Sequence, residues 1–266
     1  MQNALLKGKV QARLIAIAIL LLFGAVRLRF EQQLTNEHRA AYFHSAQLNL
    51  DLRQQLGQMG FLAALSGFRA TAADVLWIQA NSAFQRVEWG RMKLLLEAVT
   101  SLQPRCEMFW DLSAWHMAFN ASASALEDRK QPREILRVKA QREYFKIGED
   151  FLLRGIQNNP DKEELYEKIA FLYEQKFRDH LKAFEYYRKA ATFPEALGYV
   201  KRFAAYHLAE IPGRESEAYA ELVALYNMGE KEWADTLFTK LNTLEEKLNI
   251  PADKKIPRPP QPASHN

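Results

Sequence analysis

Two prolines, Pro160 and Pro194, bracket two runs of helical periodicity. Apolar residues recur at intervals of three and four within each run, which is the spacing of one buried face of an α-helix. Small and large side chains alternate on these faces, as Ile169, Ala170 and Tyr173 illustrate. Because proline cannot continue a helix beyond its first turn, each proline is expected to mark the boundary of a helical unit. We therefore predict two antiparallel helices between the prolines.

The same register continues on both sides of this segment. An alanine follows ten residues after each of three prolines, in the pairs Pro104 with Ala114, Pro160 with Ala170, and Pro194 with Ala204. Alanine is a common residue, but three agreements at a single offset are rare by chance, so the recurrence indicates a structural repeat. A small residue at this place allows two helix backbones to approach closely.

This pattern resembles the tetratricopeptide repeat, in which antiparallel helix pairs stack into an α-solenoid. The resemblance implies an all-α fold with a repeat domain over residues 61–249. The stretch 67–191, which contains GFRATAADVLWIQAN and FWDLSAWHMAFNAS, is similar to a bacterial subgroup of membrane-anchored tetratricopeptide-like proteins. No catalytic residues come with that resemblance. The interval from Pro104 to Pro160 is longer than that from Pro160 to Pro194, and we assign the additional length to a polar loop at 125–137.

The N-terminal region predicts a membrane anchor. Residues 14–26 read LIAIAILLLFGAV, and extending this run to 10–30 gives a span long enough to cross a bilayer if the flanking arginines reach the headgroups. Two alternatives remain: a cleaved signal peptide, which fits the basic residues of the short N-terminus 1–9, and a soluble or buried helix. Residues 31–60 contain no proline and carry one narrow apolar seam, which predicts a polar helical stalk.

Charge and cysteine content exclude several classes of function. The formal charge of +4 comes from the two ends of the chain, because the N-terminal segment 1–30 contains five cations and no acid. The body at 31–249 is slightly acidic, whereas a nucleic-acid-binding surface needs clustered Lys and Arg. One cysteine, Cys106, excludes an internal disulfide and a cysteine-based zinc site. We predict no nucleic-acid partner, no metal and no cofactor.

In a tetratricopeptide array the first helix of each pair lines a concave groove. That register places eleven residues in the groove: Asp74, Trp77, Asn81, Met108, Asp111, Trp115, Phe119, Glu164, Glu167, Phe171 and Glu174. Some relatives grip a peptide carboxylate with basic residues here, and this chain has acids at most of those places. We therefore expect an apolar segment carrying Lys or Arg to bind, with Trp77 and Trp115 as anchors. In the simpler alternative both tryptophans pack in the core.

No motif predicts an enzyme. The pairs Asp179–His180 and Asp111–His116 lack a companion nucleophile, a phosphate loop or metal-ligand spacing, and we expect them to be hydrated residues on the protein surface. We predict a single-pass protein of a bacterial envelope membrane, most simply the inner one, that acts as a scaffold or adaptor for a protein or peptide partner.

An alternative from a different class is a small-ligand or lipid-binding protein with a pocket walled by Trp77, Phe109, Trp110, Trp115 and Phe119. After Pro194 we expect helices at 195–210, 215–227 and 230–248. The remaining residues 250–266 hold five of the ten prolines and predict a disordered tail.

Overall fold

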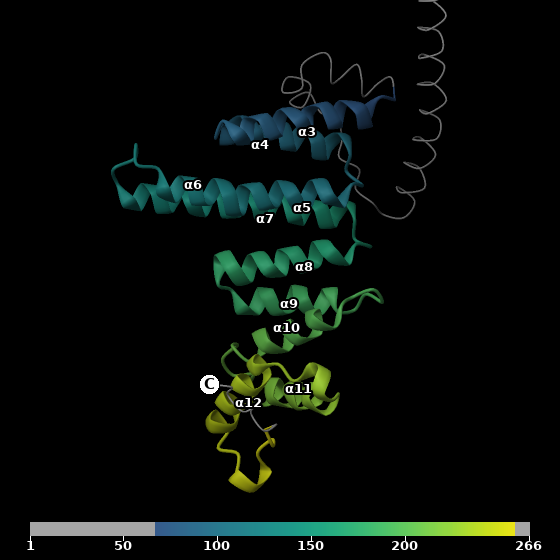
Figure 1. The fold of residues 1–266 in the computed structure, drawn as a ribbon, viewed down its shortest axis with the longest axis vertical. Coiled ribbons are helices and arrows are strands. Elements are labelled where there is room, and N and C mark those ends of the chain that lie inside the picture. The colour runs from purple at the N-terminus through teal and green to yellow at the C-terminus, as the bar shows by residue number, and fades with distance from the viewer. Residues whose placement is uncertain (1–66, 259–266) are drawn as a thin grey trace, which may run out of the picture. The chain divides into compact units, whose positions relative to one another are not determined.

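The structure is a computed structural model that describes residues 67–258, in two compact units divided after Asp161. We call the described residues 67–161 unit 1 and residues 162–258 unit 2. Every regular element in this range is a helix and no strand is present, which confirms the predicted all-α class (Figure 1). Among these helices, none combines the length and hydropathy needed for a membrane span. The predicted anchor at 10–30 and stalk at 31–60 lie outside the described residues.

Unit 1 begins with an antiparallel pair, α3 (Arg69–Gln85) and α4 (Trp89–Leu102). The facing sides are unequal in size, with buried alanines on one helix and larger buried side chains on the other: Ala73, Ala80 and Ala83 on α3, and Met92, Leu96 and Val99 on α4. The small side chains allow close approach, and the large ones fill the space between. The turn lies at 86–88, where Val87 has a left-handed φ of 60°. α4 begins directly after this turn, at Trp89.

The second pair of unit 1 is longer. α5 (Glu107–Trp115), the π-helical segment η1 (His116–Ala121) and α6 (Ser122–Glu127) follow one another, and α7 (Glu134–Asn158) packs along all three (Figure 1). Contact is close at Gly148, where a Cβ would stand 2.6 Å from Ala118 Cβ and 2.9 Å from the carbonyl oxygen of Ala114. Only glycine permits this approach.

The additional length between Pro104 and Pro160 is mainly helix, not loop. We predicted a polar loop at 125–137, but α6 continues to Glu127, α7 starts at Glu134, and the connection covers only 128–133. Both helices extend further at the end where α6 connects to α7. Three apolar side chains are exposed at this end: Leu126, Ile135 and Leu136. Charge content misled the prediction, because solvated helix faces and loops are equally polar.

The proline register has a physical basis in unit 1. The Pro104 carbonyl accepts hydrogen bonds from Trp110 Nε1 and from Asn159 Nδ2, both at 2.9 Å. Asn159 stands directly before Pro160, so the bond ties the start of α5 to the end of α7. Ala114 is buried, as the register predicts, and so are Ala170 and Ala204 in unit 2.

Unit 2 opens with α8 (Glu163–Leu172), the π-helical segment η2 (Tyr173–Phe177), α9 (His180–Ala190) and α10 (Gly198–Leu208). Consecutive helices pack against each other, with Ile169 and Ala170 of α8 and Ala183 and Tyr187 of α9 all buried. η2 ends at Arg178 in a left-handed conformation, and Asp179 then caps α9 by accepting a hydrogen bond from the Lys182 amide at 3.0 Å.

The last part of unit 2 contains α11 (Glu215–Asn227), the 3-10 turn η3 (Glu230–Glu232), α12 (Asp235–Lys247) and the short turn η4 (Ala252–Lys254). The helix at 215–227 has the bounds we expected, whereas the expected helix at 230–248 starts only at Asp235. Residues 250–258 fall in the segment predicted as a disordered tail. The Ile256 amide there donates to the buried Glu245 carboxylate at 2.8 Å.

Candidate functional site

An exposed aromatic surface lies on the first helix of the long hairpin in unit 1. Trp115 is 44% exposed, and its ring stacks on Phe119 with centroids 4.2 Å apart and planes 11° from parallel. Met108, two turns earlier, is 51% exposed. The residues Met108, Trp115 and Phe119 form what we call the Trp115 shelf. A tryptophan held flat and open to solvent loses little conformational entropy on binding a partner.

The π-helical segment contributes to this geometry. Trp115 ends α5 and Phe119 lies inside η1, so the stacked rings span the point at which the helix widens. Ser122 Oγ donates to the Ala118 carbonyl at 2.6 Å, which satisfies an acceptor in the irregular turn. π-helical turns are rare and are frequent at functional sites. The sequence offered no signal for η1.

The other predicted anchor, Trp77, packs inward. The centroid of its ring lies 5.4 Å from that of Phe109 and 6.5 Å from that of His116. Trp77 also packs against the buried cluster that includes Ala73 and Val99. The core interpretation therefore fits Trp77, and the exposed-anchor interpretation fits Trp115. Of the remaining predicted groove residues in unit 1, Asp74 and Asn81 are exposed and Asp111 is half-buried.

The predicted groove residues of unit 2 are mostly engaged within the unit. Glu164 is exposed and Phe171 is half-buried. The Glu167 carboxylate accepts a hydrogen bond from Tyr199, which together with burial raises the pKa of Tyr199 to about 12. Glu174 is held in an internal network. Glu167 and Glu174, two of the three acids expected in this part of the groove, therefore already accept hydrogen bonds from the protein's own side chains.

That network is a chain of four side chains from three elements. Tyr187 OH donates to Glu174 Oε2 at 2.9 Å, His207 Nε2 lies 3.2 Å from the same oxygen, and His207 Nδ1 lies 3.0 Å from His180 Nδ1. The ring of His207 also stacks on Tyr187 at 5.5 Å. We expected His180 to be a hydrated surface residue, and this expectation was wrong, because its ring is half-buried and pairs with His207 of the next helix.

Burial and hydrogen bonding set the protonation of this chain. Burial alone would raise the pKa of Glu174, but hydrogen bonds from His207 and Tyr187 outweigh it and hold that pKa below its usual value. Burial, reinforced by His207, lowers the pKa of His180. Only one proton fits between the two facing ring nitrogens, so one nitrogen donates and the other accepts. These contacts join side chains of η2, α9 and α10, so they fix the packing of the three elements.

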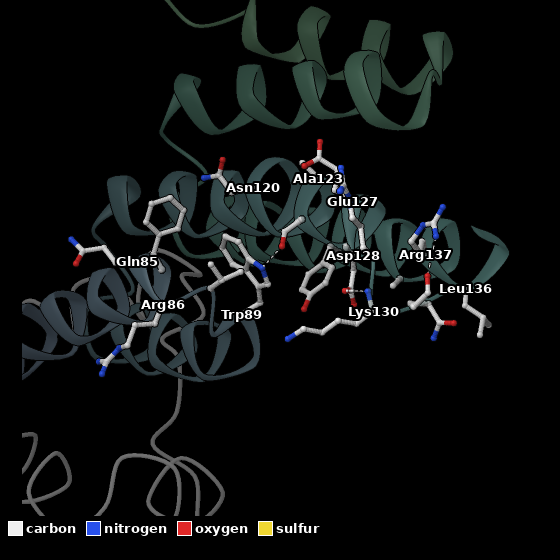
Figure 2. Close-up of a pocket in the computed structure, with 18 residues that line it drawn as sticks. Gln85, Arg86, Trp89, Asn120, Ala123, Glu127, Asp128, Lys130, Leu136 and Arg137 are labelled. Atoms are coloured by element: carbon white, nitrogen blue, oxygen red, sulfur yellow. Dashed lines mark hydrogen bonds between the residues drawn. The ribbon is translucent and has the colours of Figure 1, made fainter. Parts of the chain in front are cut away.

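A large open cleft lies at the other end of the long hairpin in unit 1 (Figure 2). Its volume is about 1220 Å³. One wall is the α3–α4 turn with Phe84, Arg86 and Trp89, and the opposite wall is the start of α7 with Leu136 and Arg137. Trp89 Nε1 donates to Ser124 Oγ at 2.9 Å, which joins the first wall to α6.

None of the eleven predicted groove residues lines this cleft. It arises because the α6–α7 connection extends past the end of the α3–α4 hairpin (Figure 1). The signal in the sequence was the additional length between Pro104 and Pro160, which we had assigned to a loop. Among residues 67–258, no group of three or more His, Cys, Asp or Glu side chains is arranged to hold a metal ion.

The chain was compared with protein-family models, with curated proteins and with solved structures, and none of the three comparisons gave a match. The tetratricopeptide resemblance therefore rests on the repeat register and remains a prediction.

Proposed function

We propose that this protein is a helical-repeat scaffold that recruits a protein partner through the Trp115 shelf of unit 1. In this proposal residues 10–30 anchor it in a bacterial envelope membrane. The observation that carries the proposal is the exposure of Trp115, which lies flat on Phe119 at the surface and is not packed in the core. Tryptophan is the side chain most enriched at the energetic centres of protein interfaces.

The preferred partner segment is apolar and basic. Asp74 is exposed on the first helix of the α3–α4 pair, and Asp111 lies between Met108 and Trp115 on α5. A lysine or arginine in the bound segment would gain both a carboxylate and the face of an aromatic ring. The Glu167 and Glu174 carboxylates of unit 2 accept hydrogen bonds from Tyr199 and Tyr187, so they are less suited to this role than the exposed Asp74.

The alternative of a small-ligand or lipid pocket receives less support. Of its five proposed wall residues, Phe109 and Trp110 are buried in the core and Trp77 packs against that core. Trp115 and Phe119 form the outward-facing shelf. None of the five rings lines the cleft described above.

Binding of a fluorescein-labelled synthetic peptide, with alternating leucine and lysine around a phenylalanine, tests this proposal in the full-length protein. Fluorescence anisotropy should show that Trp115→Ala weakens binding roughly tenfold or more, as expected for the loss of an interface anchor. Ile135→Ala is the matched control, because Ile135 is 73% exposed on α7 and lies outside the shelf. Equal affinities for the folded Trp115→Ala protein and the wild type would contradict the proposal.

A further inference from the structure

We propose that the cleft between the α3–α4 turn and the start of α7 is a second binding site, which takes an acidic peptide segment with a large apolar side chain. This site is separate from the Trp115 shelf and does not depend on it. The cleft's volume of about 1220 Å³ exceeds the roughly 300–1000 Å³ of ordinary small-molecule pockets. Its size and openness suit an extended chain segment better than a compact metabolite.

We call the aromatic part of the lining, formed by Phe84, Trp89 and Tyr144, the floor of the cleft, and it is rigid. Phe84 and Trp89 meet edge to face with centroids 5.7 Å apart, and Phe84 also contacts the ring of His116 at 4.9 Å. Tyr144 of α7 lines the cleft from the other side, and burial raises the pKa of its phenol. The rings are fixed by their neighbours, so an apolar side chain of the ligand finds a preformed surface.

The rim of the cleft is positively charged. Four cations line it, Arg86, Arg129, Lys130 and Arg137, against two acids, Glu127 and Asp128. Within the described part of the chain, the Arg129 and Lys130 side chains form no ion pair. The Asp128 carboxylate accepts a hydrogen bond from the Lys130 amide at 2.9 Å, so it is already engaged by the loop backbone. Carboxylates of a ligand complement this surplus.

A polar group between floor and rim favours a peptide over other anionic ligands. The Asn120 amide nitrogen lies 3.0 Å from His116 Nδ1, and burial lowers the pKa of His116, which keeps its ring neutral. Whichever tautomer His116 adopts, one amide atom of Asn120 pairs with it and the other is left for the cleft. A peptide backbone supplies both donors and acceptors to that atom, whereas a lipid headgroup offers chiefly phosphate oxygens.

Two pairs of variants of the full-length protein test the site. The probe is a fluorescein-labelled synthetic peptide of glutamates around a central phenylalanine, and binding is followed by anisotropy at physiological salt. Charge reversal of Arg129 and Lys130 to Glu should weaken binding roughly tenfold. The matched control reverses Arg133 and Lys139, exposed cations of the same hairpin that do not line the cleft, and should change affinity by no more than about twofold because exposed charges outside the contact are screened by salt.

The second pair tests the apolar part of the α7 wall. Leu136→Asp places a carboxylate in the cleft and should abolish measurable binding of the acidic peptide, whereas Ile135→Asp, one residue away but outside the cleft, should leave it unchanged. If both charge-reversal variants weakened binding of the acidic peptide equally, the proposal would be wrong, because the peptide would then be attracted by the general positive charge of the hairpin and not by the cleft. A further contradicting result would be binding to vesicles of anionic phospholipid, lost in Ile135→Asp, without binding of the peptide.

The two proposed sites can be distinguished by exchanging probes. Trp115→Ala should not affect the acidic peptide, and charge reversal of Arg129 and Lys130 should not weaken the basic peptide. If the acidic peptide binds while the basic one does not, the cleft stands and the proposed function fails. If the basic peptide binds while the acidic one does not, the proposal for the cleft is wrong and the proposed function is unaffected.

Discussion

Replacing Gly148 by alanine tests the packing of the long hairpin through the sign of a stability change. In the middle of an exposed helix the substitution would stabilise the protein by about 0.5–1 kcal/mol, because glycine loses more backbone entropy on folding. In the structure, however, the new Cβ would stand 2.6 Å from Ala118 Cβ and 2.9 Å from the Ala114 carbonyl oxygen. Real Cβ atoms do not approach other heavy atoms so closely, so the helices must separate.

Overpacking of this kind costs about 1–3 kcal/mol, and the contact with a backbone oxygen places it towards the upper end. When the gain in helix propensity is subtracted from this cost, Gly148→Ala should lower the free energy of unfolding by about 1–2 kcal/mol. Urea denaturation followed by far-ultraviolet circular dichroism measures the change. Gly90→Ala is the matched control, because nothing lies within 4 Å of the added Cβ there, and it should be neutral or slightly stabilising.

A double variant sharpens the test. Ala118→Gly removes the nearer of the two clashing atoms, so Gly148→Ala should cost less in the Ala118→Gly background than in the wild type. The contact with the Ala114 carbonyl remains, so the recovery should be partial. If Gly148→Ala stabilised the protein as Gly90→Ala does, α7 would not pack against η1 and α5 in this register.

Three further substitutions probe single positions by chemical denaturation. Val87→Gly should stabilise the protein by about 1 kcal/mol, since a β-branched residue is strained at a φ of 60° and Val87 is largely exposed; a loss of stability would contradict this. Glu163 is buried, and this burial, with neighbouring glutamates, raises its pKa from 4.5 to about 6. Stability is therefore lost as pH rises from 4.5 through 6, and Glu163→Gln should stabilise by about 1 kcal/mol at pH 7 but not below pH 4.5. The folded-state pKa of His180 is lowered from 6.5, so stability should fall as pH drops below 6.5. His180→Asn should show a shallower fall between pH 7 and 5, a window above that in which the lowered pKa of Glu174 acts, and an unchanged slope would count against the histidine pair.

The helical class and much of the hairpin register could be predicted from the sequence because both depend on local periodicity. Ala114, Ala170 and Ala204 are buried as their offsets from proline indicate, and α11 has the expected bounds. These features need only the identity of residues a few positions apart along one helix.

The candidate sites depend on contacts that local patterns do not contain. The repeat register places both Trp77 and Trp115 in the groove, yet one packs on Phe109 and the other faces solvent because the neighbouring elements differ. His180 and His207 meet only after α9 and α10 have packed together. The cleft could be predicted only by recognising that the segment 125–137 extends α6 and α7. The polarity of that segment does not reveal this, because exposed helices and loops are both polar.

Site-specific photo-crosslinking in cells tests the central claim most directly. A photoreactive phenylalanine derivative is placed at position 115 of the full-length protein and, as a control, at position 228, where Met228 is 59% exposed in unit 2. Partner recruitment through the Trp115 shelf predicts a discrete polypeptide adduct from position 115 that is absent from position 228. No adduct from position 115, or the same adducts from both positions, would contradict it.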